Sequence, residues 1–127
     1  MSENWILADY ETALSQLESA LSVPADSDLI KAGCIQYFEF SFELAWKSIK
    51  LASLSQGLPE CASPKACLKQ AFSLGWISDE ETWLEMLEAR NRMSHTYNAK
   101  HALAVYDRLS HFLPEQKLLL MRLQEQQ

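Results

Sequence analysis

Apolar residues recur at steps of three and four along most of the chain, which is the spacing of one face of an α-helix. The first such series predicts an amphipathic helix over residues 5–22, ending before Pro24. Residues 28–56 then run without proline and carry two apolar series at once. A helix that is apolar around so much of its circumference is either central in the fold or shared with a partner.

A third helix is predicted by its capping residues. Ser63 offers an N-cap, and Pro64 follows at the first helical position, where its missing N–H does no harm. Gly75 is a typical residue for ending a helix. We therefore expect a short helix over about residues 64–74.

Two further helices are predicted in the second half of the chain. Residues 78–81 form a capping box, so a helix should start there and carry Arg90 near its C-terminal end. A fray or turn should follow at about 95–98. The last helix should span about 99–123, with a kink or break near Phe112-Leu113, because Pro114 lies inside its pattern.

Composition fits one helical domain over residues 1–127. Apolar residues make up 48% and charged residues 22%, and there are only 3 Gly and 4 Pro, so the chain can bury a core and has few helix breakers. The expected fold is all-α, an antiparallel bundle of four or five helices. The four tryptophans should be core or dimer-contact residues: Trp5, Trp46, Trp76 and Trp83.

The net charge and the number of cysteines limit the functions and cellular locations that we expect. The formal net charge of −6 disfavours nonspecific binding to nucleic acid, so any RNA contact needs a local cationic patch or a partner. No signal peptide or transmembrane run is visible, and no metal or cofactor site is predicted. We expect a cytoplasmic protein with reduced thiols at Cys34, Cys61 and Cys67, Cys34 being buried in a helix. A Cys61–Cys67 disulfide is the alternative.

The octapeptide RNRMSHTY, from Arg90 to Tyr97, is the candidate for chemistry. Arginine is a permanent cation that can bind a phosphate with two N–H groups, and histidine moves protons near neutral pH. Random placement would produce the Arg-x4-His-x-Tyr spacing in about three of a thousand such chains. These groups suit RNA cleavage by attack of the 2′-hydroxyl on the adjacent phosphorus, without a metal.

The spacing of Arg90 and His95 favours a site shared by two chains. Five residues of an ideal helix turn through about 500°, so the two would point about 140° apart unless the helix ends or distorts between them. In-line displacement also needs a base and an acid on opposite sides, and one octapeptide supplies one histidine. Two copies related by a two-fold axis would supply both.

Structural roles are the alternative for these residues. Arg90 could be a helix C-terminal cation paired with Glu85 or Glu88. His95 could bond a backbone carbonyl, and Tyr97 could pack its ring on the core.

Glu39, Glu43 and Lys47 recur every four residues on the second predicted helix. One interpretation is a solvated ladder of side chains along one helix face. The other places a carboxylate near the site, where it orients Arg90 or His95.

The chain resembles the HEPN superfamily, and within it the small nucleotidyltransferase substrate-binding proteins. This group includes toxins of HEPN–minimal-nucleotidyltransferase (MNT) toxin–antitoxin pairs. The resemblance rests on residues 35–47, 63–72 and 83–98, and most strongly on Arg90-Asn91 followed by residues 94–98.

This resemblance implies a dimeric helical bundle in which two such motifs face one endoribonuclease cleft. Arg90 would hold the scissile phosphate and His95 would transfer protons, with Asn91 and Ser94 in supporting positions. The partner nucleotidyltransferase would be the antitoxin, and it would transfer AMP from ATP to Tyr97, adding bulk and negative charge beside the site. The alternative is a non-catalytic subunit that presents a substrate to that nucleotidyltransferase.

Overall fold

The computed structural model describes residues 4–95 and 99–126, with side chains for all of them except Asn4, Ser94, His95, Ala99 and His101. Within these ranges the chain is helical and contains no strand, which confirms the all-α prediction. The helices are α1 (Asn4–Leu21), α2 (Asp28–Ser55), α3 (Pro64–Ser73), α4 (Glu80–His95), α5 (Ala99–Ala104) and α6 (Tyr106–Glu125). The first three agree with the predicted ranges to within one residue at each end.

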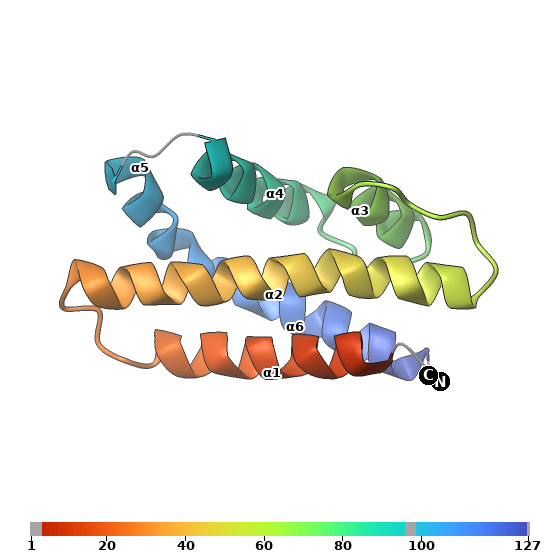
Figure 1. Ribbon diagram of the computed structural model, residues 1–127, viewed down its shortest axis with the longest axis horizontal. Coiled ribbons are helices and arrows are strands. Elements are labelled where there is room, and N and C mark those ends of the chain that lie inside the picture. Colours follow the sequence, from red (N-terminus) through yellow and green to blue (C-terminus); the bar gives the residue numbers. More distant parts are fainter. Residues whose placement is uncertain (1–3, 96–98, 127) are drawn as a thin grey trace.

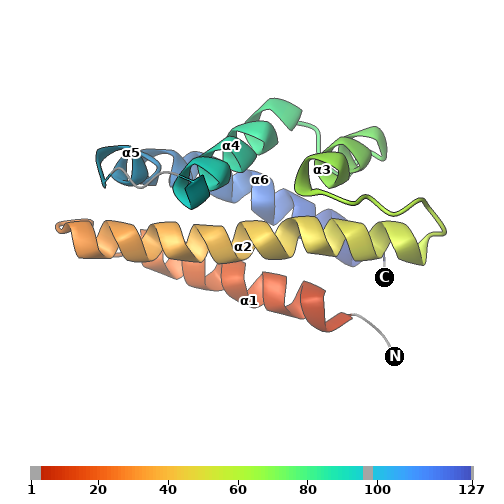
Figure 2. The ribbon, with the colours of Figure 1, turned by 45° about the horizontal axis from the view of Figure 1, so that its top comes forward.

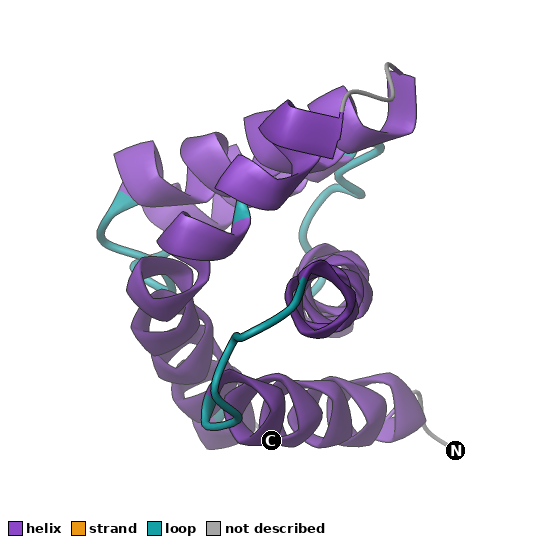
Figure 3. Ribbon diagram, turned by 90° about the vertical axis from the view of Figure 1, so that its left-hand side faces the viewer, coloured by secondary structure: helices purple, strands orange, loops and turns teal. Residues whose placement is uncertain are grey.

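Helix α2 is the central element of the bundle (Figure 1). It contacts α1, α3, α5 and α6, and α1 returns beside it as an antiparallel hairpin. Helices α3 and α4 lie on the side of α2 opposite α1, and α6 runs behind (Figure 2). The other helices curve around α2, so that one of its sides has no helix over it (Figure 3).

The largest side chains of the core are aromatic and come from α1, α2, α4 and α6. The largest of them are fully buried: Tyr10, Phe38, Phe42, Trp83 and Phe112. The ring centroids of Phe38 and Phe112 are 5.4 Å apart, and those of Phe42 and Trp83 are 6.3 Å apart. Burying each such side chain contributes about 1.5–3 kcal/mol, so these contacts fix α4 and α6 on α2. Among the described residues, no helix has the length and apolar character needed to cross a bilayer.

Helix α4 begins one residue later than the predicted capping box implies, because Asp79 rather than Ser78 acts as its cap. The Asp79 carboxylate accepts hydrogen bonds from the Thr82 backbone N–H (3.0 Å) and the Thr82 hydroxyl (2.7 Å). A carboxylate also interacts better than a serine hydroxyl with the positive end of the helix dipole. The two bonds from Thr82 hold the pKa of Asp79 below its usual range.

An ion pair between Glu85 and Arg108 connects α4 to α6. Arg108 donates from Nε to Glu85 Oε2 (2.7 Å) and from Nη2 to Glu85 Oε1 (3.0 Å). These hydrogen bonds from Arg108 lower the pKa of Glu85.

The predicted last helix is divided, but not at the predicted place. The chain breaks at Val105, between α5 and α6, whereas α6 continues through Pro114. The expected break near Phe112-Leu113 is therefore wrong. Pro114 removes the hydrogen bond to the Ser110 carbonyl, and both residues lie on the exposed face, where water can bind that carbonyl. Phe112 and Gln116, two residues before and after Pro114, are buried and keep the helix packed on the core.

The cysteines differ from the expectation of three reduced thiols. Cys34 is a free, buried residue of α2, as predicted. Cys61 and Cys67 instead form a disulfide, with their Cα atoms 5.0 Å apart. The segment after α2 folds back before Ser63 caps α3, and this turn brings the two residues within bonding range. Sequence spacing alone does not reveal that turn.

Removing the Cys61–Cys67 bond should lower the free energy of unfolding by about 2 kcal/mol, because the closed loop restricts the unfolded chain. Urea unfolding of the wild type with and without reductant, and of the variant C61S/C67S, measures this change. The variant Cys34→Ser, which retains the bond, should remain sensitive to reductant. Equal stability of the oxidised and reduced wild type would contradict the prediction.

Acid should destabilise the protein through Asp79 and Glu85. The pKa of each is lowered by folding, so each contributes stability above the usual carboxyl range that is lost as the pH falls through the folded pKa. We expect the free energy of unfolding to fall between about pH 5 and pH 3, and to fall less in the variant D79N/E85Q.

Urea unfolding followed by circular dichroism at several pH values tests this expectation. Asp9→Asn, on the exposed face of α1, is the matched control and should follow the wild-type curve. A D79N/E85Q curve parallel to that of the wild type would assign the acid sensitivity to other groups.

Candidate active site

Arg90 lies on the α2-facing side of α4, where it forms an ion pair with Glu43. Its Nε donates to Glu43 Oε2 (2.7 Å) and its Nη2 donates to Glu43 Oε1 (3.2 Å). The two side chains are 29% and 33% exposed. A two-pronged, charge-assisted contact of this kind fixes the plane of the guanidinium as well as its position.

Two neighbouring side chains extend this pair into a chain of hydrogen bonds. Arg90 Nη1 donates to Asn91 Oδ1 (3.1 Å), and Trp46 Nε1 donates to Glu43 Oε1 (3.0 Å). The four residues therefore link α2 to α4 along a partly exposed edge. Asn91 and Glu43 thus stand beside Arg90, and their supporting roles remain predictions.

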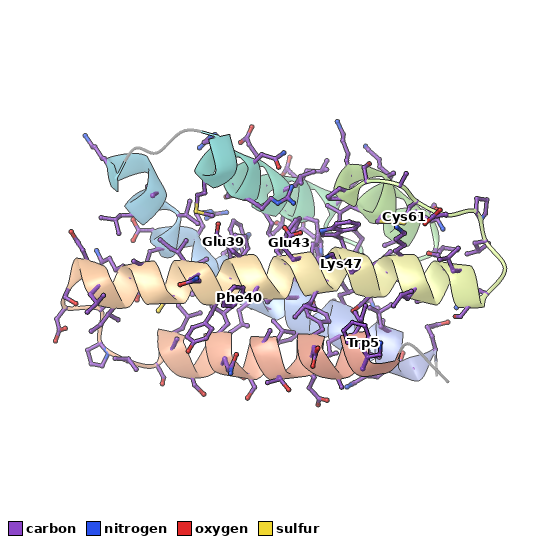
Figure 4. All side chains as sticks on the ribbon, in the orientation of Figure 1. Trp5, Glu39, Phe40, Glu43, Lys47 and Cys61 are labelled. Atoms are coloured by element: carbon purple, nitrogen blue, oxygen red, sulfur yellow. A yellow bond between two sulfur atoms is a disulfide. The ribbon has the colours of Figure 1, made fainter. Side chains whose placement is uncertain are left out.

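Glu39 precedes Glu43 by one turn of α2. Figure 4 shows both carboxylates on the edge of α2 that faces α4. Burial raises the pKa of Glu39, and the nearby Glu43 charge raises it further, while Arg90 acts in the opposite direction. Lys47 completes the predicted series, but its Nζ lies over the Trp46 ring, 5.9 Å from the centroid. Glu43 thus contacts Arg90 rather than forming part of a solvated ladder, and its role in orienting Arg90 remains a prediction.

Helix α4 continues from Glu80 to His95, so it does not end between Arg90 and His95. The helical positions of these two residues are about 140° apart around the axis. The side chains of Ser94 and His95, and all of Tyr97, lie outside the described residues. Their predicted roles remain predictions.

The predicted alternative partners of Arg90 are engaged elsewhere. Glu85 binds Arg108, and Glu88 accepts a hydrogen bond of 3.0 Å from Arg92. The structure thus pairs Arg90 with Glu43 rather than with Glu85 or Glu88.

A separate open hollow of about 260 Å³ lies between α4 and the α5–α6 segment. Its lining includes Arg92 and Arg108 over an apolar base formed by Val105 and Phe112, and both arginines already pair with glutamates. In the part of the chain that the structure describes, no group of three or more His, Cys, Asp or Glu residues could hold a metal ion.

Trp46 is the member of the candidate site that sequence reasoning missed. It packs partly buried against the core, as expected, and its indole N–H also binds Glu43. Residues three apart on a helix share a face, so the Glu43–Trp46 spacing was an available signal.

Comparisons with known proteins agree with this architecture. A family described as nucleotidyltransferase substrate binding protein like matches residues 6–125. A Haemophilus influenzae protein named probable ribonuclease HepT is 34% identical over 102 residues, which cover 77% of this chain and 70% of that protein.

Two solved structures have the same fold. One is a Thermus thermophilus protein, with a TM-score of 0.81 and 29% identity over 90% of this chain and 98% of that chain. The other, from Haemophilus influenzae, is described as revealing the fold of a substrate binding domain of a nucleotidyltransferase. Its TM-score is 0.81 and its identity 29%, over 93% of this chain and 98% of that chain. The chain therefore belongs to the family of nucleotidyltransferase substrate binding proteins, as its sequence predicts.

Proposed function

We propose that this protein is the toxin of a toxin–antitoxin pair, a metal-independent endoribonuclease that acts as a homodimer. The observation that carries this proposal is the placement of Arg90, which a two-pronged carboxylate contact holds at a partly exposed edge. This arginine begins the Arg-x4-His-x-Tyr motif. Similarity to a protein named as a probable ribonuclease supports the same reaction.

The reaction is cleavage of RNA by its own 2′-hydroxyl. His95 of one protomer removes the 2′-hydroxyl proton, and the oxygen attacks the adjacent phosphorus. The bond to the 5′-oxygen breaks, and a second imidazole, from the other protomer, protonates that oxygen. Arg90 stabilises the negative charge on the phosphorus centre. The products are a 2′,3′-cyclic phosphate and a 5′-hydroxyl.

Two observations support a two-fold composite site. Because α4 is continuous through His95, one chain supplies its Arg90 and His95 positions on different sides of one helix. Leu29, Phe40 and Leu54 are 82%, 49% and 42% exposed. Their spacings of 11 and 14 residues put them within about 40° of one another around α2, on a face that also carries the exposed Gln36 and Lys47 and that a second copy would cover.

The partner in this proposal is a minimal nucleotidyltransferase that acts as antitoxin. It transfers AMP from ATP to the hydroxyl of Tyr97, two residues after His95: the hydroxyl oxygen bonds to the α-phosphorus, the bond to the β-phosphate breaks, and pyrophosphate leaves. The added phosphate and nucleoside bring negative charge and bulk next to the motif, and both oppose the binding of RNA.

A second candidate is a non-catalytic subunit that presents a substrate to the nucleotidyltransferase. It is supported by the description of the matching family and by that of the Haemophilus influenzae structure. The two functions differ in whether the isolated dimer cleaves RNA.

Wild-type protein in EDTA should cleave RNA to products with 2′,3′-cyclic phosphate ends. Arg90→Ala and His95→Ala should each lower the rate by about 100-fold or more, with helicity retained. Arg108→Ala also removes an ion-paired arginine, but one outside the candidate site, and should leave the rate unchanged. An all-2′-deoxy oligonucleotide of the same sequence, which lacks the attacking 2′-hydroxyl, should remain intact. A wild-type dimer that binds the nucleotidyltransferase but cleaves no cellular RNA would favour the second candidate.

Incubation with the partner nucleotidyltransferase and ATP should add AMP to Tyr97, as measured by mass spectrometry of the intact protein and its peptides. Tyr97→Phe should abolish the addition, and Tyr106→Phe should not. RNA cleavage should fall in proportion to the modified fraction. Unmodified Tyr97 in the presence of an active partner would remove this part of the proposal.

A further inference from the structure

We propose that Glu43 and Trp46 are the positioning residues of the nuclease site: Trp46 fixes the Glu43 carboxylate, and Glu43 fixes the Arg90 guanidinium against the scissile phosphate. This inference rests on the proposed function. Neither residue touches RNA in this scheme. Both act through Arg90, whose orientation determines how well it stabilises the transition state.

The geometry of the Arg90–Glu43 contact supports this role. Arginine has a long side chain with many rotamers, and a partly exposed arginine would sample several of them. The contacts of 2.7 and 3.2 Å restrict both the direction of the side chain and the plane of its guanidinium. The contact from Nη1 to Asn91 involves the adjacent residue of the same helix. Glu43 thus ties Arg90 to a different element, α2.

Trp46 completes the arrangement because the carboxylate itself needs to be held. Glu43 Oε1 accepts hydrogen bonds from both Trp46 Nε1 (3.0 Å) and Arg90 Nη2 (3.2 Å). Since Trp46 follows Glu43 by three residues on α2, its indole shares that helix face. The Trp46 ring is half-buried and has few rotamers. It is therefore the rigid end of the series of hydrogen bonds that runs from Trp46 through Glu43 to Arg90.

The negative charge of Glu43 has opposite effects on the positioning of Arg90 and on the binding of RNA. A carboxylate beside the phosphate site repels RNA, so Glu43 weakens the attraction of Arg90 for the substrate. Replacing Glu43 by glutamine removes that repulsion and also loosens the hold on the guanidinium. The expected signature is a fall in kcat with no weakening of RNA binding. A purely structural role would leave kcat per folded molecule unchanged.

The test compares cleavage and binding in the full-length dimer. Glu43→Gln should lower kcat by about tenfold to a hundredfold, with KM and the Kd for an all-2′-deoxy oligonucleotide unchanged or lower. Trp46→Phe, which keeps a ring but removes the N–H donor, should give a smaller fall. The double variant should be no slower than Glu43→Gln alone, because both substitutions act through one group.

Glu85→Gln is the matched control, since it breaks a carboxylate–arginine pair of the same form that also involves α4. It should alter stability and leave kcat unchanged. The NMR signal of the Arg90 Nε–H gives a readout without RNA: it should be protected from exchange in the wild type and unprotected in Glu43→Gln.

The outcomes separate the positioning role from the nuclease function. If the wild type cleaves RNA and Arg90→Ala does not, but Glu43→Gln matches the wild type, the positioning role is overturned and the nuclease function stands. A fall in kcat that Glu85→Gln reproduces would also overturn it, since the effect would then be general destabilisation. If the wild type cleaves no RNA, the proposed function fails and the positioning role fails with it.

Discussion

The packing of Trp83 on Phe42 is the contact on which the candidate site depends. Trp83 is fully buried, and its ring lies 6.3 Å from that of Phe42, which fixes α4 against α2. Arg90 follows Trp83 by seven residues, a rotation of about 700°, and therefore lies within about 20° of the same face of α4. Side chains of a helix lean toward its N-terminus, so Arg90 reaches back toward Glu43, the neighbour of Phe42. The packing of Trp83 on Phe42 thus places Arg90 within hydrogen-bonding distance of Glu43.

Under the proposed function, the ion pair also accounts for how an acidic protein holds a cation in place for an anionic substrate. A lone arginine at a partly buried edge would be poorly placed, since its rotamers are many and its charge would be partly desolvated. Glu43 offsets that desolvation and restricts the rotamers, at the expense of local positive charge. Glu39, with its pKa raised chiefly by burial, adds less negative charge than an exposed glutamate would at low pH. In this site, Glu43 fixes the orientation of the Arg90 guanidinium but weakens its electrostatic attraction for an anion.

Sequence patterns predicted most of the fold because helix periodicity and capping are local. The ranges of α1, α2 and α3 follow from apolar spacing and from Ser63-Pro64. The departures depend on tertiary contacts. Pro114 was expected to kink or break the last helix near Phe112-Leu113, but the buried face of α6 holds the chain helical through it. The Cys61–Cys67 bond depends on how the loop after α2 returns, and the partnership of Glu43 with Arg90 depends on how two helices pack.

The continuity of α4 gives the strongest reason to regard the proposed site as a property of an assembly. A helix that broke after Arg90 would let one chain bring its own guanidinium and imidazole together. Here the helix runs on to His95, and an ideal turn separates the two positions by about 140°. Packing of α4 on α2 places the Arg90 guanidinium on Glu43, which Trp46 also contacts. In the proposed mechanism a second chain supplies the complementary imidazole, so a group added two residues beyond His95 would act where the proposed protomers meet.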